Sequence, residues 1–475
     1  MTKLGVPFAA LALALGGCAS SSIGSDVGRV RELTRVSTLA NVADTDVDPA
    51  VPEEARKLLA KPLDADAAVR IALLNNRELR ATLREMGIFR GRLVQAGLLP
   101  NPSVEAELVP EPDSSLELRV EYDLTRALFA PMRSRAAEPE VEAARYRAAA
   151  AVIETGGRVR AAFYAWSAAE QRLALAHQSL DAWAAGVEAA SAMFQAGNVP
   201  ELDLAGNVAA YEKARVAVAE TELEVATARE HLLRLLGVQG LETKIRIAGE
   251  LPAAPREPGV PAGIEGRAVR ASLELREARE RLEGLSRRSG LATTTGIVPD
   301  LSVDVHALRE TDETDAANED RWRWGAGVNV TIPLFDRNQG TAAALDAEFD
   351  ALLERYYGMA VDVRSAAREA KARVLSAHSR AQKYATVIVP AEQRVVEQTL
   401  LQYNAMQVGV FQLLDARRDE LAARYAYVDA LRAYWTAHSE LEALLAGRRV
   451  SAEGAEARRA PAGDTGETSR SGGGH

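Results

Sequence analysis

Apolar residues in the second half of the chain recur at a spacing that predicts one very long helix. From Leu345 they follow alternating steps of three and four residues, with a single slip at Ala370, which is the seam of a coiled coil with one stutter. At about 1.5 Å per residue, a helix from Asn338 to Met406 would be a rod of roughly 100 Å. Pro390 lies inside it and predicts a kink or a missing hydrogen bond. The predicted seam positions are 345, 349, 352, 356, 359, 363, 366, 370, 374, 377, 381, 384, 388, 391 and 395.

Four short segments alternate between apolar and polar residues, which is the pattern of strands with one apolar face. They are residues 103–108 and 116–122 in the first half, and 301–306 and 322–332 in the second. Charged side chains occupy the second face, and Trp322 and Trp324 would suit the aromatic girdle of a membrane barrel. A soluble sheet that packs on helices alternates in the same way and is the competing interpretation.

The strands predict an assembly of several chains if they face a membrane. Four strands cannot close a barrel, and open strand edges are not tolerated in hydrocarbon. Three copies would supply about twelve strands, an even number within the range of outer-membrane barrels. The long helices can bury their apolar faces against one another, which favours this interpretation over a sheet packed on helices.

The two halves repeat one order of elements. Ala68-Val69-Arg70 recurs as Ala268-Val269-Arg270, and residues 99–105 resemble residues 298–304. Each half therefore contains a helix, a pair of strands, a very long helix, a turn and a returning helix. An acidic insertion between His306 and Trp322 has no counterpart of equal length in the first half.

Residues suited to a turn follow each long helix. In the first half Gly197 can take the left-handed C-terminal position, Asn198 can cap the next helix, and Glu201 can bond back to that cap. In the second half Gly409 marks the turn. The returning helices are predicted at about residues 202–236 and 411–445, so each half ends in an antiparallel hairpin.

Segments rich in proline or glycine mark the predicted boundaries between regions of the chain. Four prolines between the halves predict an extended crossover, and the Gly, Ser, Glu and Arg-rich end of the chain predicts a disordered tail. The predicted regions are a signal peptide (1–17), a lipidated N-terminal segment (18–62), a first repeat (63–237), a Pro-rich crossover linker (238–262), a second repeat (263–447) and the tail (448–475).

The N-terminus has the layout of a secretory signal, with Lys3 before an apolar run that ends in Leu15-Gly16-Gly17-Cys18. Cys18 is the only cysteine of the chain, and its place resembles a bacterial lipobox, in which the thiol is acylated. An ordinary signal peptide with an incidental cysteine is the alternative. No aspartate follows Cys18 directly, which resembles lipoproteins sent to the outer membrane. No later stretch has the roughly 18 uninterrupted apolar residues of a membrane helix.

Composition narrows the classes of function. The chain has 475 residues, and its 47% hydrophobic content with only 5% aromatics favours long, thin helical packing over a thick core. A net charge of -10 argues against nucleic acid as a partner. The six histidines show no metal-ligand spacing, and no phosphate-binding G-x-x-x-x-G-K run occurs. We therefore expect no enzyme, no metal site and no cofactor beyond a covalent lipid on Cys18.

From about Leu63 to Gly447 the chain resembles the TolC-type outer-membrane efflux proteins, the outer-membrane factor family. The most specific part is the run Ile332-Pro333-Leu334-Phe335-Asp336-Arg337-Asn338-Gln339-Gly340, which is similar to the strand-to-helix junction of lipoprotein members that serve heavy-metal and drug efflux. A physical interpretation agrees with this: Pro333 ends the strand ladder, Asp336 or Asn338 can cap the helix, and Gly340 allows close backbone contact.

The resemblance implies a mainly α fold with membrane β structure. Its two repeats would each supply a long coiled-coil α-hairpin and a β-hairpin, and three protomers would form a twelve-stranded β-barrel in the outer membrane, continued by a periplasmic α-helical barrel. The implied function is a passive exit duct for small molecules or metal ions, docked to a periplasmic adaptor and an inner-membrane pump. The duct of a type I protein secretion system and a lipid-anchored periplasmic coiled-coil scaffold are the alternatives.

In the family, the tip of the second hairpin carries Tyr, Gly and two aspartates at the constricted periplasmic mouth. Here Tyr403 matches, Met406 stands where Gly is usual, Gln412 replaces the first aspartate, and Asp415 matches the second. Asp203 occupies the first-half position equivalent to Gln412. The resemblance therefore assigns the periplasmic gate to Asp415, Gln412 and Asp203. Alternatively, Asp415 faces solvent or pairs with Arg417 or Arg418 on a neighbouring helix.

The same resemblance assigns contact with the adaptor to the hairpin tips. Val199, Val410 and Phe411 could equally serve packing between helices. The residues assigned to this contact are Gly197, Asn198 and Val199 in the first tip and Val408, Gly409 and Val410 in the second.

Overall fold

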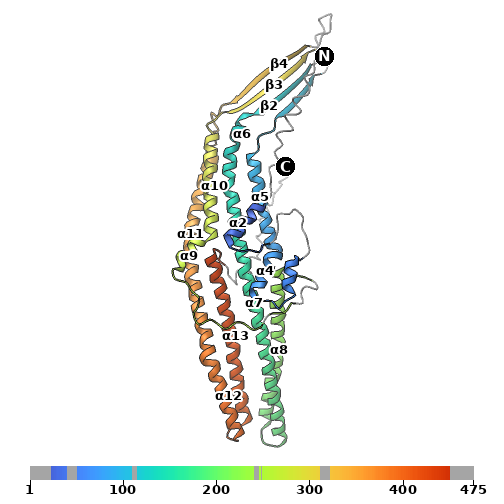
Figure 1. The fold of residues 1–475 in the computed structure, drawn as a ribbon, viewed down its shortest axis with the longest axis vertical. Coiled ribbons are helices and arrows are strands. Elements are labelled where there is room, and N and C mark those ends of the chain that lie inside the picture. The colour runs from blue at the N-terminus through green and yellow to red at the C-terminus, as the bar shows by residue number, and fades with distance from the viewer. Residues whose placement is uncertain are drawn as a thin grey trace, which may run out of the picture.

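A computed structural model describes residues 23–39, 51–109, 115–239, 245–247, 249–310 and 321–449. These residues form an elongated molecule with a sheet at one end and the tips of two helical hairpins at the other (Figure 1). Two short helices precede the first repeat, α2 (Gly24–Thr34) and α3 (Glu53–Leu59). Cys18 and the tail beyond residue 449 lie outside the described residues.

The repeated order of elements predicted from the sequence is confirmed. The first repeat comprises α4 (Ala65–Asn75), α5 (Arg77–Gly97), β1 (Ser103–Val109), β2 (Ser115–Asp123), α6 (Leu124–Leu128), α7 (Ala130–Gln195) and α8 (Glu201–Leu236). The second repeat comprises α9 (Ile264–Ala271), α10 (Leu273–Thr295), β3 (Asp300–Glu310), β4 (Arg321–Thr331), α11 (Gln339–Lys383), the π-turn η2 (Tyr384–Ile388), α12 (Val389–Asn404) and α13 (Val410–Ala446).

Both repeats close with the same glycine contact. Gly237 and Gly447 end the returning helices α8 and α13 in the left-handed conformation, with φ of 69° and 116°. A Cβ atom on Gly237 would lie 2.8 Å from the carbonyl oxygen of Asn75, and one on Gly447 would lie 2.4 Å from that of Ala271. These carbonyls mark the breaks between α4 and α5 and between α9 and α10. Glycine is therefore required at the end of each returning helix, where that helix contacts the first helices of the same repeat.

The seam of the predicted long helix is correct as far as Ala391, just beyond the π-turn. Every predicted position from Leu345 to Ala391 is buried or half-buried, and Val374 and Ala381 are fully buried. The π-turn ends at Ile388, two positions before Pro390, which cannot donate a hydrogen bond to the preceding turn. It adds one residue to the helical register, so Val395 is 49% exposed and Val396 is half-buried instead. The prediction of position 395 as a seam residue was wrong for this reason.

The proline-rich crossover lies along the second hairpin. The indole Nε1 of Trp435 donates to the carbonyl of Pro252 at 2.8 Å, and the Gln382 amide donates to that of Pro255 at 2.8 Å. An isolated parallel bridge pairs Leu63 with Ile247, which joins the start of the first repeat to the segment before the crossover. The crossover is thus attached to α11 and α13.

The four strands form one antiparallel sheet in the order β1-β2-β3-β4. The two hairpins of the two repeats are joined through β2 and β3, which pair from Ser115 with Glu310 to Asp123 with Ser302. The strand β3 continues to Glu310, so residues 307–310 of the predicted insertion extend the strand. The rest of that insertion, residues 311–320, lies outside the described residues.

Candidate functional site

The register of the sheet places apolar side chains in continuous rows on one face. One row runs across all four strands as Val104, Val120, Val305 and Ala326. A parallel row contains Ala106, Leu118, Ala307 and Trp324. Side chains of this face are largely exposed, with Val104 at 72% and Trp324 at 76%. A soluble sheet packed on helices would bury them, so that competing interpretation does not fit the described sheet.

The opposite face of the sheet is polar, and its side chains bond both along β3 and between β2 and β3. Its rows place Glu121 beside Asp304 and Arg119 beside His306. His306 Nδ1 lies 3.0 Å from Asp304 Oδ2, and Ser302 Oγ donates to Glu121 at 2.6 Å. A sheet with one apolar and one charged face is suited to separate lipid from water.

Two glycines of β4 make room on this polar face. A Cβ atom on Gly325 would lie 2.2 Å from the imidazole of His306, and one on Gly327 would lie 2.3 Å from the carboxylate of Asp304. The side chains of β3 therefore fold over the backbone of β4. The alternation of β4 left these glycines unexplained, because their role depends on the cross-strand register.

The outer strands β1 and β4 leave one free edge each within the described sheet. The two edges belong to different repeats and lie on opposite sides of the sheet. Edge strands with exposed apolar side chains are templates for pairing with a further strand. Each of these two edges is therefore available to pair with a further strand.

At the strand-to-helix junction, Pro333 follows the last residue of β4, Thr331, by two positions. Leu334 and Phe335 are exposed, Phe335 at 91%. The Asp336 carboxylate accepts a hydrogen bond from the backbone N–H of Asn338 at 2.9 Å, which forms a local turn before α11.

The expected roles of Asn338 and Gly340 at this junction were wrong. Asn338 precedes α11 with φ of 58°, and its side chain does not cap that helix but donates to Thr295 of α10 at 3.1 Å. A Cβ atom on Gly340 would meet nothing within 4 Å. The close backbone contact is made by Gly296, where a Cβ atom would lie 1.9 Å from the carbonyl oxygen of Arg337.

At the tip of the first hairpin, Gly197 has φ of 74°, as its predicted left-handed role requires. The backbone N–H of Asn198 donates to the carbonyl of Met193 at 2.9 Å, so Asn198 helps to close the preceding helix. Its predicted role as the cap of α8 was wrong, because the residue before that helix is Pro200 and no side chain caps it. Val199 is half-buried.

At the tip of the second hairpin, Met406 takes the left-handed conformation with φ of 58° and is 94% exposed. It occupies the position equivalent to Gly197. Gly409 has an extended backbone and is the residue before α13, where its N–H donates to the side chain of Gln412 at 3.1 Å. Val408 and Val410 are half-buried.

The three residues assigned to the gate all lie in the first turns of returning helices. Asp203 is exposed in α8, and Gln412 is exposed while its side chain caps α13. Asp415 lies one turn further along α13 and pairs with Arg418 of the same helix at 3.2 Å. Both partners are more than half exposed, so this ion pair is worth little to stability.

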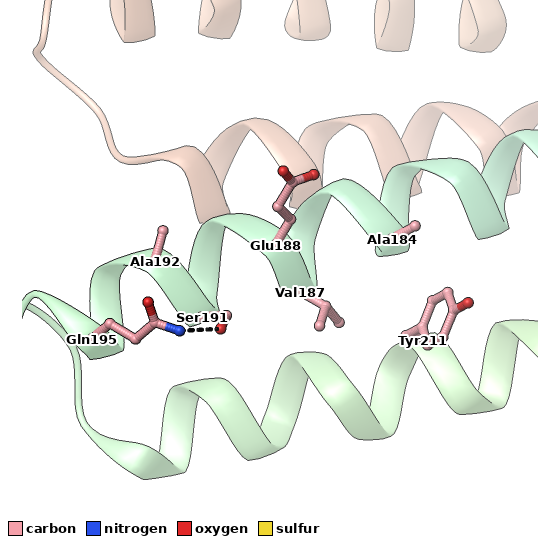
Figure 2. Close-up of a pocket in the computed structure, with 7 residues that line it drawn as sticks. All are labelled: Ala184, Val187, Glu188, Ser191, Ala192, Gln195 and Tyr211. Atoms are coloured by element: carbon pink, nitrogen blue, oxygen red, sulfur yellow. Dashed lines mark hydrogen bonds between the residues drawn. The ribbon is translucent and has the colours of Figure 1, made fainter.

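A shallow groove of about 580 Å³ lies beside the first tip, between α7 and α8. Figure 2 shows Tyr211 of α8 reaching toward α7, with Val187 between the two helices and Glu188 pointing away from α8. Gln195 donates to Ser191 at 3.4 Å along the same side of α7. The groove therefore combines an apolar floor with polar side chains close to the tip.

Among the described residues, no group of three or more His, Cys, Asp or Glu side chains is arranged to hold a metal ion. No described helix is both long enough and apolar enough to cross a membrane.

Comparison with known proteins agrees with this geometry. Residues 117–238 match the family model of the outer membrane efflux protein. The cobalt-zinc-cadmium resistance protein CzcC of Cupriavidus metallidurans is 26% identical over 417 residues, which cover 84% of this chain and 93% of that protein. The resemblance to outer-membrane efflux proteins stated from the sequence is confirmed.

Solved structures show the same fold. The structure of CusC has a TM-score of 0.66 at 18% identity, covering 80% of this chain and 91% of that chain. The CmeC outer membrane channel of Campylobacter jejuni has a TM-score of 0.66 at 17% identity, covering 81% and 85%. The outer-membrane channel OprN has a TM-score of 0.66 at 19% identity, covering 87% and 97%. The predicted mainly α fold, with two repeats of a long α-hairpin and a β-hairpin, is confirmed.

Proposed function

We propose that this chain, which is similar to the outer-membrane efflux proteins, is the outer-membrane duct of a tripartite efflux system and not an enzyme. Three copies join their sheets edge to edge into a twelve-stranded barrel, and their hairpins form a tunnel through the periplasm. The tunnel is a passive route for small molecules or metal ions, with a periplasmic adaptor and an inner-membrane pump as partners.

The observation that carries this proposal is the sheet with two unlike faces and two free edges. Its apolar face needs lipid and its polar face needs water, and each free edge needs a strand of a neighbouring copy. A coiled-coil scaffold would explain the hairpins but has no use for such a sheet.

Metal ions or small molecules are the proposed cargo. The name of CzcC, a cobalt-zinc-cadmium resistance protein, supports a metal among them. The junction run from Phe335 to Gly340, which is similar to that of metal and drug efflux members, supports the same choice. Deletion of the gene should lower the tolerated concentration of zinc, cobalt or cadmium, and secretion of proteins should be unchanged.

Two measurements on the purified protein test whether it forms a channel. The protein extracted from outer membranes in detergent should have the mass of a trimer and should form pores in planar bilayers. A water-soluble monomer that forms no pores would reject the proposal.

The gate belongs to the same proposal. Three copies of Asp415 around the axis would attract cations and repel anions, and Arg418 would reduce that charge. Asp415→Ala should lower the cation selectivity of the single channel, whereas Arg418→Ala should raise it. Equal current and selectivity in both variants would leave Asp415 as a solvent-facing residue with a helical ion pair.

Cys18 is proposed as the lipid anchor, with outer-membrane lipid as its partner. Mass spectrometry of the mature protein should find its new N-terminus at Cys18 with acyl chains attached.

A further inference from the structure

A groove of about 560 Å³ lies where the sheet meets the helices, beside α6 (Figure 1). Its walls come from α6, from the segment before β3 and from the helical ends of β3 and β4. Its apolar lining includes Leu124, Ala127, Leu128, Val298, Leu301 and Val330. Leu128 is 71% exposed and Val330 is 47% exposed, so the groove is open to the surroundings. Among the described residues that line it, no side chain is charged.

Hydrogen bonds hold the single turn of α6 against the start of β3. The Thr125 hydroxyl donates to the carbonyl of Pro299 at 3.2 Å and accepts from the N–H of Leu301 at 2.6 Å. The Asp123 carboxylate accepts from the N–H of Arg126 at 2.6 Å and caps the turn. Thr125 also lines the groove. Because its hydroxyl is already paired, the described lining offers a ligand apolar contacts.

The groove continues the apolar face of the sheet. Leu301 pairs with Val330, and both belong to the same face as Val305, because every second strand residue points to one side. Leu124 directly follows β2 and would be the next partner of Leu301 in the register. The groove therefore opens on the side of the sheet for which contact with lipid is proposed.

The position of the groove within the sheet decides between lipid and a second copy of the chain. The groove is centred on the helical ends of β2 and β3, which are the two middle strands. The edges at which copies are proposed to join belong to β1 and β4. Of the described lining residues, Val330 alone comes from an edge strand. A neighbouring copy that pairs with either edge therefore leaves the groove open to the membrane.

The height of the apolar face places the groove inside the hydrocarbon. At the far end of the sheet Trp322 pairs with Arg309, and such side chains are typical of a membrane interface. The rows at 309 and 301 of β3 are eight residues apart, which is about 26 Å along the strand and about 20 Å across the membrane at a tilt of about 40°. The apolar band of outer-membrane barrels is about 25 Å tall. The hydrocarbon therefore reaches about 5 Å beyond the strands, to the level of α6.

We propose that the groove holds one acyl chain of a phospholipid from the periplasmic leaflet of the outer membrane, with one such lipid for each copy of the chain. The proposal rests on the proposed function, because it takes the apolar face of the sheet to be in contact with lipid. Since the described lining is apolar, the groove selects a hydrocarbon chain and not a headgroup. The bound chain packs against α6 and fills the step between the sheet and the helices.

Native mass spectrometry of the trimer purified from outer membranes tests this site. After washing in detergent, the parent trimer should retain one phospholipid per copy. Phosphatidylethanolamine and phosphatidylglycerol should bind equally well when each is added back to stripped protein, because the headgroup lies outside the groove.

A groove variant and a matched control separate this lipid from the lipid that surrounds any membrane protein. Ala127→Trp fills the groove and should lower the retained lipid at least about tenfold, because the loss of about two buried methylene contacts weakens binding by that factor. Val328→Trp adds the same side chain to the same face outside the groove, where Val328 is 66% exposed, and should retain the lipid. Leu128→Gln is a second groove variant at an exposed position, which the fold tolerates, and it should also release the lipid.

Several results would overturn the acyl-chain site. Equal retention in the parent and both groove variants would place the lipid elsewhere, and equal loss in Val328→Trp would show an unspecific lipid layer. A preference for one headgroup, or bound lipopolysaccharide in place of phospholipid, would reject the proposed ligand. A pore-forming trimer that retains no phospholipid would remove the site and leave the proposed function intact, whereas a water-soluble monomer would reject the proposed function itself.

Discussion

The two hairpin tips each place one residue in the left-handed backbone conformation, and only the first uses glycine. Gly197 and Met406 have φ of 74° and 58° at equivalent positions. A residue with a Cβ atom loses roughly 1–2 kcal/mol in this conformation. The sequence pointed to Gly409 as the turn residue of the second tip, because glycine is the usual signal and methionine gives none. Met406 stands where Gly is usual in the family, but its left-handed conformation is visible only in the backbone.

We expect Met406→Gly to stabilise the second tip by about 1 kcal/mol, since glycine adopts positive φ without strain. The change should slow amide hydrogen exchange in the last turn of α12 and the first turn of α13. Gly197→Ala is the matched variant, and it should speed exchange at the first tip although open space surrounds its Cβ position. Unchanged exchange at both tips would mean that this conformation is not strained in solution.

At the scale of elements, the closing contacts of the two repeats should be the least tolerant of change. Alanine at Gly237 or Gly447 combines a left-handed backbone with a Cβ atom pressed against a carbonyl oxygen. We expect each substitution to lower the free energy of unfolding by on the order of 3 kcal/mol. Thermal melting of the protein in detergent should show a clear drop for both.

Gly206→Ala is the control for these two variants. Gly206 lies inside α8 with nothing within 4 Å of its Cβ position, so alanine should raise stability slightly through its higher helix propensity. A similar loss in all three variants would mean that the close contacts at Gly237 and Gly447 do not set their cost.

The π-turn supplies a second test among the elements. In a helix without the π-turn, Val395 would face α13. The extra residue of the π-turn turns Val396 toward α13 instead. Val396→Asn should therefore loosen α12 from α13, with a loss of about 1 kcal/mol, and Val395→Asn should cost less. Protease accessibility or hydrogen exchange along α12 would compare the two. A larger effect from Val395→Asn would restore the uninterrupted seam predicted from the sequence.

These elements show where the sequence is informative and where it is not. A periodic pattern predicts long helices well, because the same face is buried at every turn. The predicted seam positions are correct as far as Ala391. Pro390 predicted an irregularity in the long helix, but the sequence did not show which kind of irregularity it would be. A kink and a π-turn both satisfy the missing hydrogen bond, but only the π-turn shifts the register.

At the scale of the whole molecule, the repeats made the fold predictable, since the two halves supply the same order of elements once each. The chemistry at the tips was less predictable. Gln412 was matched to a gate position, and in the single chain its side chain caps α13. Asp415 was matched to the gate, and its nearest cation, Arg418, lies on the same helix. A gate at a threefold axis depends on how three chains meet, and one sequence fixes only the position of each residue on its helix.

The orientation of the sheet in the membrane gives the last prediction. Val305 lies at the middle of β3 on the apolar face, between Val120 and Ala326, and is 52% exposed. An arginine facing lipid at the middle of a barrel costs about 2–4 kcal/mol, and a trimer would carry three. Val305→Arg should therefore reduce the trimer recovered from outer membranes.

The neighbouring His306 faces the polar side and is the matched control, because His306→Arg adds the same charge one residue away. It should leave the amount of trimer close to that of the parent and should change the ion selectivity of the pore instead. If both arginines were equally harmful, or if Val305→Arg assembled normally while His306→Arg did not, the apolar face would not be the one in contact with lipid. Because adjacent strand residues point to opposite faces, the difference between the two variants reports on orientation and not on the cost of adding charge to a strand.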